Sequence, residues 1–277
     1  MIALAIDTDL VVRRHGRDPA EAATLLLLHG LTDSGAAWPD ALERWSPHYA
    51  IITVDQRGHG DSPRFTAEQL TAHPGEVMVD DLVALLEQLT DPPVVIGHSL
   101  GGAVALAAGV RRPALVRALI LEDPAPRKPG EPQLDTAKGQ LFFNENSAMQ
   151  HLSPDGFDAY RERHPTWSAT EFEMASLAKA NVDLEYLRGG DFRPVTAWPD
   201  LFSVLEVPTL VVSGDNLDEV YADAEIEQGI ERLGNHLVTL VRVPGAAHCV
   251  RREQPEAFYL LVKAWLTDIR PISPLVG

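Results

Sequence analysis

The residues best able to do chemistry together are a serine and a histidine that lie far apart in the chain. Ser99 is at the centre of Gly97-His98-Ser99-Leu100-Gly101, with an apolar run before it and an Ala- and Leu-rich stretch after it. This order predicts a strand, a sharp turn and a helix, which would present the serine hydroxyl as a nucleophile at the edge of a sheet. The flanking glycines fit this geometry, because side chains at 97 and 101 would collide with neighbouring backbone.

A serine hydroxyl needs a base to take its proton, and His248 is the histidine best placed to supply one. It lies in Val243-Pro-Gly-Ala-Ala-His-Cys, which leaves the last predicted strand and enters the last predicted helix. That position puts His248 at the carboxyl edge of the sheet, the edge that also carries Ser99. His98 is next to Ser99 in sequence, but we expect so sharp a turn to point its side chain elsewhere.

The carboxylate that would orient His248 is left open by the sequence. Two neighbouring strands are predicted to end at the same sheet edge, and four acidic residues follow them: Glu122, Asp123, Asp215 and Asp218. Asp215 and Glu122 are the two alternatives that we carry forward as the third member of the triad. Asp218 ranks behind them.

Two further loops follow predicted strands. His29-Gly30-Leu31 opens the first, where a glycine lets backbone approach a substrate closely. The Leu31 amide could then pair with the Leu100 amide to hold an oxyanion. The second loop, residues 55–62, is polar and contains two glycines, typical of a tight turn. We interpret it as mainly structural, with Arg57 and His59 at most at the rim of a pocket.

The elements that must position these residues predict an α/β fold. Short buried runs alternate with longer helical stretches, which indicates a mostly parallel, eight-stranded sheet with helices on both faces. The strands are expected at residues 2–6, 10–14, 25–28, 50–54, 94–96, 118–121, 209–212 and 237–243. Helices are expected at residues 76–89, 100–110 and 255–268.

Residues 124–203 break this alternation, because the segment contains helix-start signals and no clear strand. Ser153-Pro154 places proline at a first helical position, and residues 168–171 form a capping box. Ten of the eighteen aromatic residues also lie in this segment. We expect residues 124–203 to form a helical cap, inserted after the sixth strand of a core domain that comprises residues 1–123 and 204–277. Its aromatics would form a small core of their own or face an apolar pocket.

Composition restricts what the chain can bind. The chain has 277 residues, of which 45% are apolar and 23% charged, typical of a soluble globular protein. A net charge of −17 disfavours nucleic acids and anionic membranes as partners. Cys249 is the only cysteine, which excludes an intrachain disulfide and a Cys-cluster zinc site. No metal or organic cofactor is expected, and the lack of a long apolar run or a basic leader predicts a cytoplasmic protein.

Taken together, these motifs resemble the α/β-hydrolase superfamily. The resemblance covers about residues 10–266 and rests on His29-Gly30, Asp55-x-Arg57-Gly58-His59-Gly60-x-Ser62, Gly97-His98-Ser99-Leu100-Gly101-Gly102 and Gly245-Ala-Ala-His248, in this order. It implies Ser99 as nucleophile and His248 as base. It also implies the Leu31 and Leu100 amides as oxyanion donors.

The acid is where the chain departs from the superfamily pattern. Relatives commonly carry Gly-x-x-Asp after the seventh strand, where this chain has Leu217, with Asp215 two residues earlier. Some relatives, among dehalogenases and a fungal-lactone hydrolase, carry the acid after the sixth strand, where Glu122 stands. The resemblance therefore leaves both alternatives open.

The function that these residues imply is hydrolysis of a small, apolar carboxylic ester or lactone through an acyl-enzyme. A serine nucleophile argues against dehalogenases and epoxide hydrolases, which need a carboxylate at that position. Alternatives on the same serine are carbon–carbon bond hydrolysis of dienone acids, cofactor-free perhydrolase activity and thioester hydrolysis. An alternative of another class is a hydrolase-like small-molecule receptor with little turnover. A dienone acid would need an anchor for its carboxylate, and five arginines of the expected cap could supply one: Arg127, Arg161, Arg163, Arg188 and Arg193.

Overall fold

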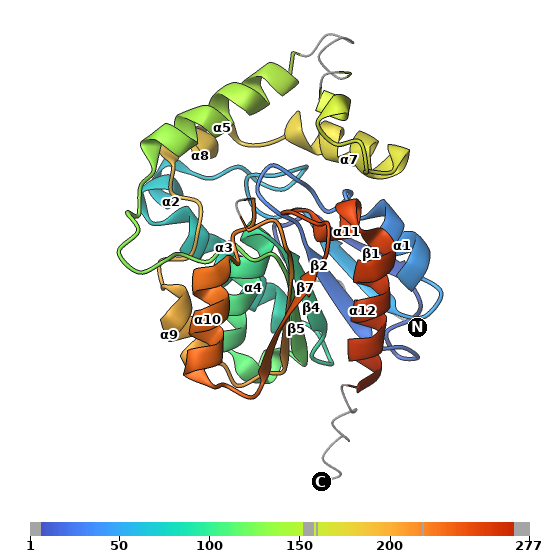
Figure 1. Cartoon of the computed structure of the whole chain (residues 1–277). Helices are drawn as coiled ribbons and strands as arrows, with labels where there is room; N and C mark the ends of the chain where they lie inside the picture. The colour runs from blue at the N-terminus through green and yellow to red at the C-terminus, as the bar shows by residue number, and fades with distance from the viewer. Residues whose placement is uncertain (1–6, 152–157, 159, 218, 269–277) are drawn as a thin grey trace.

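The computed structural model describes residues 7–151, 158, 160–217 and 219–268. Within these residues the chain forms one sheet of seven strands, in the order β1-β3-β2-β4-β5-β6-β7 (Figure 1). β1 is antiparallel to β3, and every other neighbouring pair is parallel. The strands are β1 (Val12–Gly16), β2 (Thr24–Leu28), β3 (Ala50–Val54), β4 (Val94–His98), β5 (Ala118–Glu122), β6 (Thr209–Gly214) and β7 (Val238–Val243). The strand expected at residues 2–6 lies outside the described residues, so an eighth strand stays a prediction.

Helices cover both faces of this sheet, which confirms the expected α/β class. In Figure 1, α1 and α12 lie on one side of the sheet and α3, α4 and α10 on the other. The helices of the core are α1 (Pro39–Trp45), α2 (Ala67–Thr71), α3 (Pro74–Leu86), α4 (Leu100–Arg111), α10 (Ala224–Leu233), α11 (Val250–Glu253) and α12 (Pro255–Asp268), with a short 3-10 turn at Pro113–Leu115.

The strands divide their side chains between two apolar cores, because successive residues of a strand point to opposite faces. On β5, Leu119 and Leu121 enter the core that contains residues of α3 and α4. Ala118 and Ile120 enter the other core, which contains Phe258 of α12. The same alternation indicates which face of the sheet the side chain of a strand's last residue points to.

The segment between β5 and β6 is helical where it is described. Its helices are α5 (Thr136–Met149), α7 (Ala169–Lys179), α8 (Leu184–Gly189) and α9 (Trp198–Ser203). Figure 1 shows α5, α7 and α8 above the sheet edge, whereas α9 lies beside α10. The Trp198 ring of α9 fills the space where Gly229 of α10 has no side chain. The helix start expected at residues 153–154 lies outside the described residues.

The capping box expected at residues 168–171 forms only in half. The Ser168 side chain accepts a hydrogen bond from the Glu171 amide, as an N-cap should. The Glu171 carboxylate binds Arg252 of α11 instead, with 2.7 Å between Oε2 and Nε. A side chain that would have capped the helix therefore ties α7 to the core.

Candidate active site

Ser99 occupies a sharp turn between the end of β4 and the start of α4. Its φ of 52° and ψ of −115° lie outside the regions that a serine prefers, so the turn is strained. A Cβ on Gly97 would come within 2.5 Å of the Gly101 carbonyl oxygen, and one on Gly101 within 2.5 Å of the Leu28 and His29 carbonyl oxygens. The two glycines of the motif are thus required by close backbone packing around the serine.

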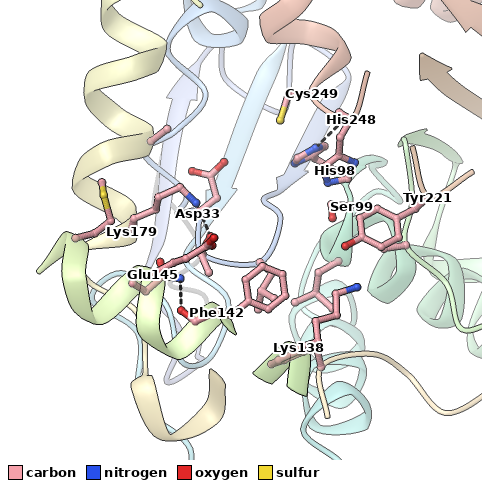
Figure 2. Close-up of a pocket in the computed structure, with 18 of the residues that line it drawn as sticks. Asp33, His98, Ser99, Lys138, Phe142, Glu145, Lys179, Tyr221, His248 and Cys249 are labelled. Carbon is pink, nitrogen blue, oxygen red and sulfur yellow. Dashed lines mark hydrogen bonds between the residues drawn. The ribbon is translucent and has the colours of Figure 1, made fainter. Parts of the chain in front are cut away.

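Ser99 faces a cavity of about 490 Å³ between the sheet edge and the helices of the insertion. Ser99, His248, Leu31 and Leu100 all contribute to its lining, and Figure 2 shows Ser99 and His248 on the same wall. The volume is in the range of sites that bind small molecules. The structure therefore brings together four of the residues singled out from the sequence.

The carboxylate that contacts the His248 imidazole belongs to Asp123. Its Oδ2 lies 2.5 Å from His248 Nδ1. Asp123 is buried and follows β5 directly, in a turn with a φ of 36°. It also accepts hydrogen bonds from the Ser213 hydroxyl at 2.7 Å and from the amides of Tyr221 and Ala222 at 3.0 Å. These donors, together with His248, hold the carboxylate in a fixed position.

Neither alternative that we carried forward for the acid contacts His248. Glu122 is fully buried and accepts two hydrogen bonds from Arg251 at 2.8 Å, one from its amide and one from Nη1. Glu122 has the parity of Ile120 along β5, which directs it toward the core that holds α12. Asp215 is exposed and accepts from the Gly245 amide at 2.9 Å. Asp218 lies outside the described residues.

The carbonyl groups that precede the Leu31 and Leu100 amides are both hydrogen-bonded. In a trans peptide unit the C=O of one residue and the N–H of the next point in opposite directions. The Gly30 carbonyl accepts from His29 Nδ1 at 2.8 Å and from the Asp33 amide at 3.2 Å, which turns the Leu31 N–H the other way. The Ser99 carbonyl accepts from the Ala103 amide within α4, so the Leu100 N–H points out of the helix start.

His98 lies beside His248, and our expectation that it points elsewhere is wrong. The two rings are 4.8 Å apart, and His98 Nε2 donates to the His248 backbone carbonyl at 3.2 Å. Burial, with the charges of His248 and Arg251, holds the pKa of His98 well below its ordinary value. A neutral His98 therefore positions the backbone of His248.

The loop at residues 55–62 supports the core and does not contribute Arg57 or His59 to the cavity lining. Arg57 forms a two-pronged ion pair with Asp81 of α3, at 2.7 and 2.9 Å. His59 is fully buried, with its ring against His29 and Tyr186. The prediction that this loop is mainly structural agrees with these contacts. The prediction that Arg57 and His59 lie at the rim of the pocket does not.

The five arginines considered as anchors have different surroundings. Arg127 and Arg193 line the cavity but bind Asp191 and Glu131, respectively. Arg188 pairs with Glu185, and the guanidinium group of Arg161 lies over the Phe172 ring. Arg163 lines the cavity from an exposed position over the Tyr160 ring.

The described residues contain neither a metal-binding cluster nor a helix that could span a membrane. No group of three or more His, Cys, Asp or Glu side chains there could hold a metal ion. No described helix is both long and apolar enough to cross a bilayer.

Comparison of the sequence with models of protein families shows the family of this chain. A family model described as "Alpha/beta hydrolase family" matches residues 25–259, most of the chain. The chain belongs to the α/β-hydrolase family. The resemblance drawn from the motifs is thereby confirmed, as is the fold class, and the chain is a hydrolase.

Individual relatives of this α/β hydrolase carry different names. 2-(Acetamidomethylene)succinate hydrolase of Mesorhizobium japonicum is 29% identical over 261 residues, which cover 89% of this chain and 87% of the relative. Lipase LipV of Mycobacterium tuberculosis is 42% identical over 118 residues, which cover 42% of each chain. The solved structure of N-formylmaleamic acid deformylase from Pseudomonas putida S16 is similar, with a TM-score of 0.72 at 22% identity, covering 91% of this chain and 94% of that one. At that identity the structural similarity shows the fold alone.

Proposed function

We propose that this α/β hydrolase cleaves a carboxylic ester or lactone through an acyl-enzyme formed on Ser99. The observation that carries the proposal is the contact between His248 Nδ1 and Asp123, made beside a strained serine that opens onto the same cavity. Nucleophile, base and orienting acid are the three roles that this chemistry needs. The proposed acid is Asp123, in place of Asp215 or Glu122.

In the acylation step, Ser99 Oγ attacks the carbonyl carbon of the substrate while His248 Nε2 takes the hydroxyl proton. Asp123 holds the imidazole through Nδ1 and stabilises the imidazolium that forms. The carbonyl oxygen becomes an oxyanion, for which the Leu31 and Leu100 amides are the proposed donors. The tetrahedral intermediate collapses, His248 returns the proton to the departing alkoxide, and the acyl group stays on Ser99.

Deacylation repeats these steps with water as the nucleophile. His248 takes a proton from the water as it attacks the acyl carbonyl, and the same amides hold the second oxyanion. Collapse of this intermediate releases the carboxylic acid, while His248 returns the proton to Ser99 Oγ. For a lactone, the alcohol and the acid are parts of one product.

We further propose that α5, α7 and α8 act as a cap that selects the substrate. Of these helices, α5 and α7 supply side chains to the cavity wall opposite the sheet edge, among them Phe142 of α5 and Lys179 of α7. The names of the relatives span a lipase and a succinate-derived substrate, so the leaving group and acyl part of this chain's substrate have to be found by assay.

The test combines a covalent probe with a substrate screen. A fluorophosphonate should label the purified wild type on Ser99 and leave Ser99→Ala unlabelled. Short 4-nitrophenyl esters and a lactone panel, followed over many turnovers, should then yield a multiple-turnover substrate. Labelling at another residue would refute the nucleophile. A burst of one equivalent that stops would favour the receptor alternative.

A further inference from the structure

The cavity has a charge opposite to that of the molecule as a whole. The chain carries a net charge of −17, yet six Lys and Arg residues line the cavity against three Asp and Glu. The cationic residues are Arg127, Lys138, Arg163, Lys179, Arg193 and Arg252, and the acidic ones are Asp33, Asp135 and Glu145. Because Arg127, Arg193 and Arg252 are paired with carboxylates, only the unpaired cations of the lining favour anionic ligands over neutral ones.

Lys179 differs from the three cations that have carboxylate partners, Arg127, Arg193 and Arg252, because it has none among the described residues. Its side chain is half-buried and extends from the end of α7 toward the loop that carries Asp33 (Figure 2). Its Nζ donates to the Thr32 hydroxyl at 2.9 Å, and no ion pair joins it to any carboxylate among the described residues. An ammonium group removed from water without an anion is costly, so a ligand carboxylate there would be stabilised.

Nearby acids are either engaged elsewhere or exposed. Asp33 is buried, and its Oδ2 lies 2.8 Å from Arg252 Nη2 and 3.7 Å from Arg251 Nη2. Glu145 of α5 lines the cavity from an exposed position, where water competes for its charge. Burial lowers the pKa of Lys179, with Asp33 opposing the shift, as expected for an ammonium that lacks a direct counter-ion.

The partner of Lys179 is also unusual. Thr32 has a φ of 64°, a left-handed conformation that is rare for a β-branched residue and costs free energy. This strained residue directly follows Leu31, a proposed oxyanion donor, and it places its hydroxyl against Lys179 Nζ. The loop beside the reacting carbonyl is thus connected to a cation from the insertion.

We infer that Lys179 is the anchor for a carboxylate carried by the substrate, so that the esters or lactones cleaved are those of acids with a second, free carboxylate. The inference rests on the proposed function, because it places the anchored substrate with its reacting carbonyl at Ser99. Lys138 is the competing anchor, because it too has no described ion pair. Each lysine also lies near an aromatic ring: Lys138 Nζ is 4.9 Å from the centroid of the Tyr221 ring, on the side of Ser99 (Figure 2), and Lys179 Nζ is 5.8 Å from the centroid of the Tyr160 ring.

The experiment compares charged and neutral esters of the same shape. Mono-4-nitrophenyl esters of succinate, glutarate and adipate are paired with esters in which an isopropyl group replaces the free carboxylate, and rates are corrected for spontaneous hydrolysis. The wild type should give a higher kcat/KM for the charged member of at least one pair. Lys179→Gln keeps an N–H donor for Thr32 but removes the charge. It should lower the charged-to-neutral ratio by ~10–100-fold, mainly through KM, and Lys179→Arg should restore part of it.

Control variants decide between an anchor and a structural tie. Lys263→Gln, on the exposed side of α12, should leave the ratio unchanged. If Lys179→Gln lowers both kcat/KM values equally, the lysine only tethers α7 and the inference fails. It also fails if Lys138→Gln lowers the ratio more than Lys179→Gln does.

A binding measurement separates this inference from the proposed function. Glutarate is titrated into Ser99→Ala protein and into the Ser99→Ala, Lys179→Gln double variant by calorimetry, which needs no turnover. The double variant should bind glutarate at least ~10-fold more weakly. Equal affinities would overturn the anchor even if Ser99 is labelled by the fluorophosphonate. Absence of labelling would overturn the proposed function whatever glutarate does.

Discussion

On the core side of the cavity, the groups near Ser99 are held by backbone and by buried charges, whereas on the insertion side the lining comes from α5, α7 and neighbouring segments. Asp123 accepts three hydrogen bonds besides its contact with His248, and His98 holds the His248 backbone. On the other side, α7 is joined to the core by the Glu171–Arg252 ion pair and by the bond between Lys179 and Thr32.

This difference separates reaction from recognition. The core side fixes the positions of atoms that must align within tenths of an ångström for catalysis. In the proposed function, the insertion side supplies side chains whose charge and shape would select the substrate. Variants of the core side should therefore change kcat or stability by large factors, and variants of the insertion should change preference among substrates by smaller ones.

Removing the nucleophile should have the largest effect. Ser99→Ala is expected to lower kcat by ~10⁶-fold, since loss of a triad serine leaves only the contributions of the oxyanion site and of binding. Its unfolding midpoint in urea should stay near that of the wild type or rise, because the Ser99 hydroxyl makes no packing contact that alanine would lose. A loss below tenfold would mean that the reaction does not pass through this residue.

Replacing each candidate acid compares the carboxylate that follows β5, Asp123, with the one that follows β6, Asp215. Asp123→Asn keeps the shape and favours the wrong imidazole tautomer, so kcat should fall by ~10⁴-fold. Asp215→Asn is the matched control, because Asp215 contacts only the Gly245 amide through the described hydrogen bonds of its side chain. Steady-state kinetics on one ester suffices. If Asp215→Asn proved the more damaging, the acid would come from the following strand.

How far the sequence predicts the site depends on whether a role is set by local chain geometry. The turn at Ser99 and the loop at His29-Gly30-Leu31 could be placed because strand, glycine and helix follow each other directly. Asp123 was missed by one residue, because we placed an acid after the sixth strand at Glu122. Strand parity offered a signal: Glu122 alternates with Leu121 and so faces the core with Ile120. Lys179 gave none, since its proposed role depends on a contact between residues 147 positions apart in the chain.

The ion pairs of the two sides should differ in their contribution to stability. Glu122→Gln leaves the buried Arg251 short of its main partner and should lower the free energy of unfolding by ~3–5 kcal/mol. Glu171→Gln should cost only ~1–3 kcal/mol, because Arg252 keeps Asp33 at 2.8 Å. Urea unfolding at pH 7 measures both. A larger loss for Glu171→Gln would show that α7 is as integral to the fold as β5.

The smallest effect is expected where the two sides meet, at the loop of residues 55–62. There the Gly60 amide donates to the Asn181 carbonyl and the Asp183 amide to the Gly58 carbonyl, so the loop joins the insertion to the sheet. His59 is buried in this junction, and burial, with the charge of His29, lowers its pKa from 6.5 to about 3. The unfolded chain therefore takes up a proton on His59 below about pH 6.5 while the folded chain does not.

Stability should consequently be greatest above pH 6.5 and fall as the pH drops toward about 3, with His59 contributing at most ~1.4 kcal/mol per pH unit. His59→Gln removes this titration, so the free energy of unfolding in urea, although lower overall, should decline less steeply between pH 7 and pH 4.5. Part of the slope should remain, since burial also lowers the pKa of His29 and of His98. His236→Gln, at an exposed position, is the matched control and should keep the wild-type slope. If both variants gave that same slope, His59 would not be a source of the acid sensitivity.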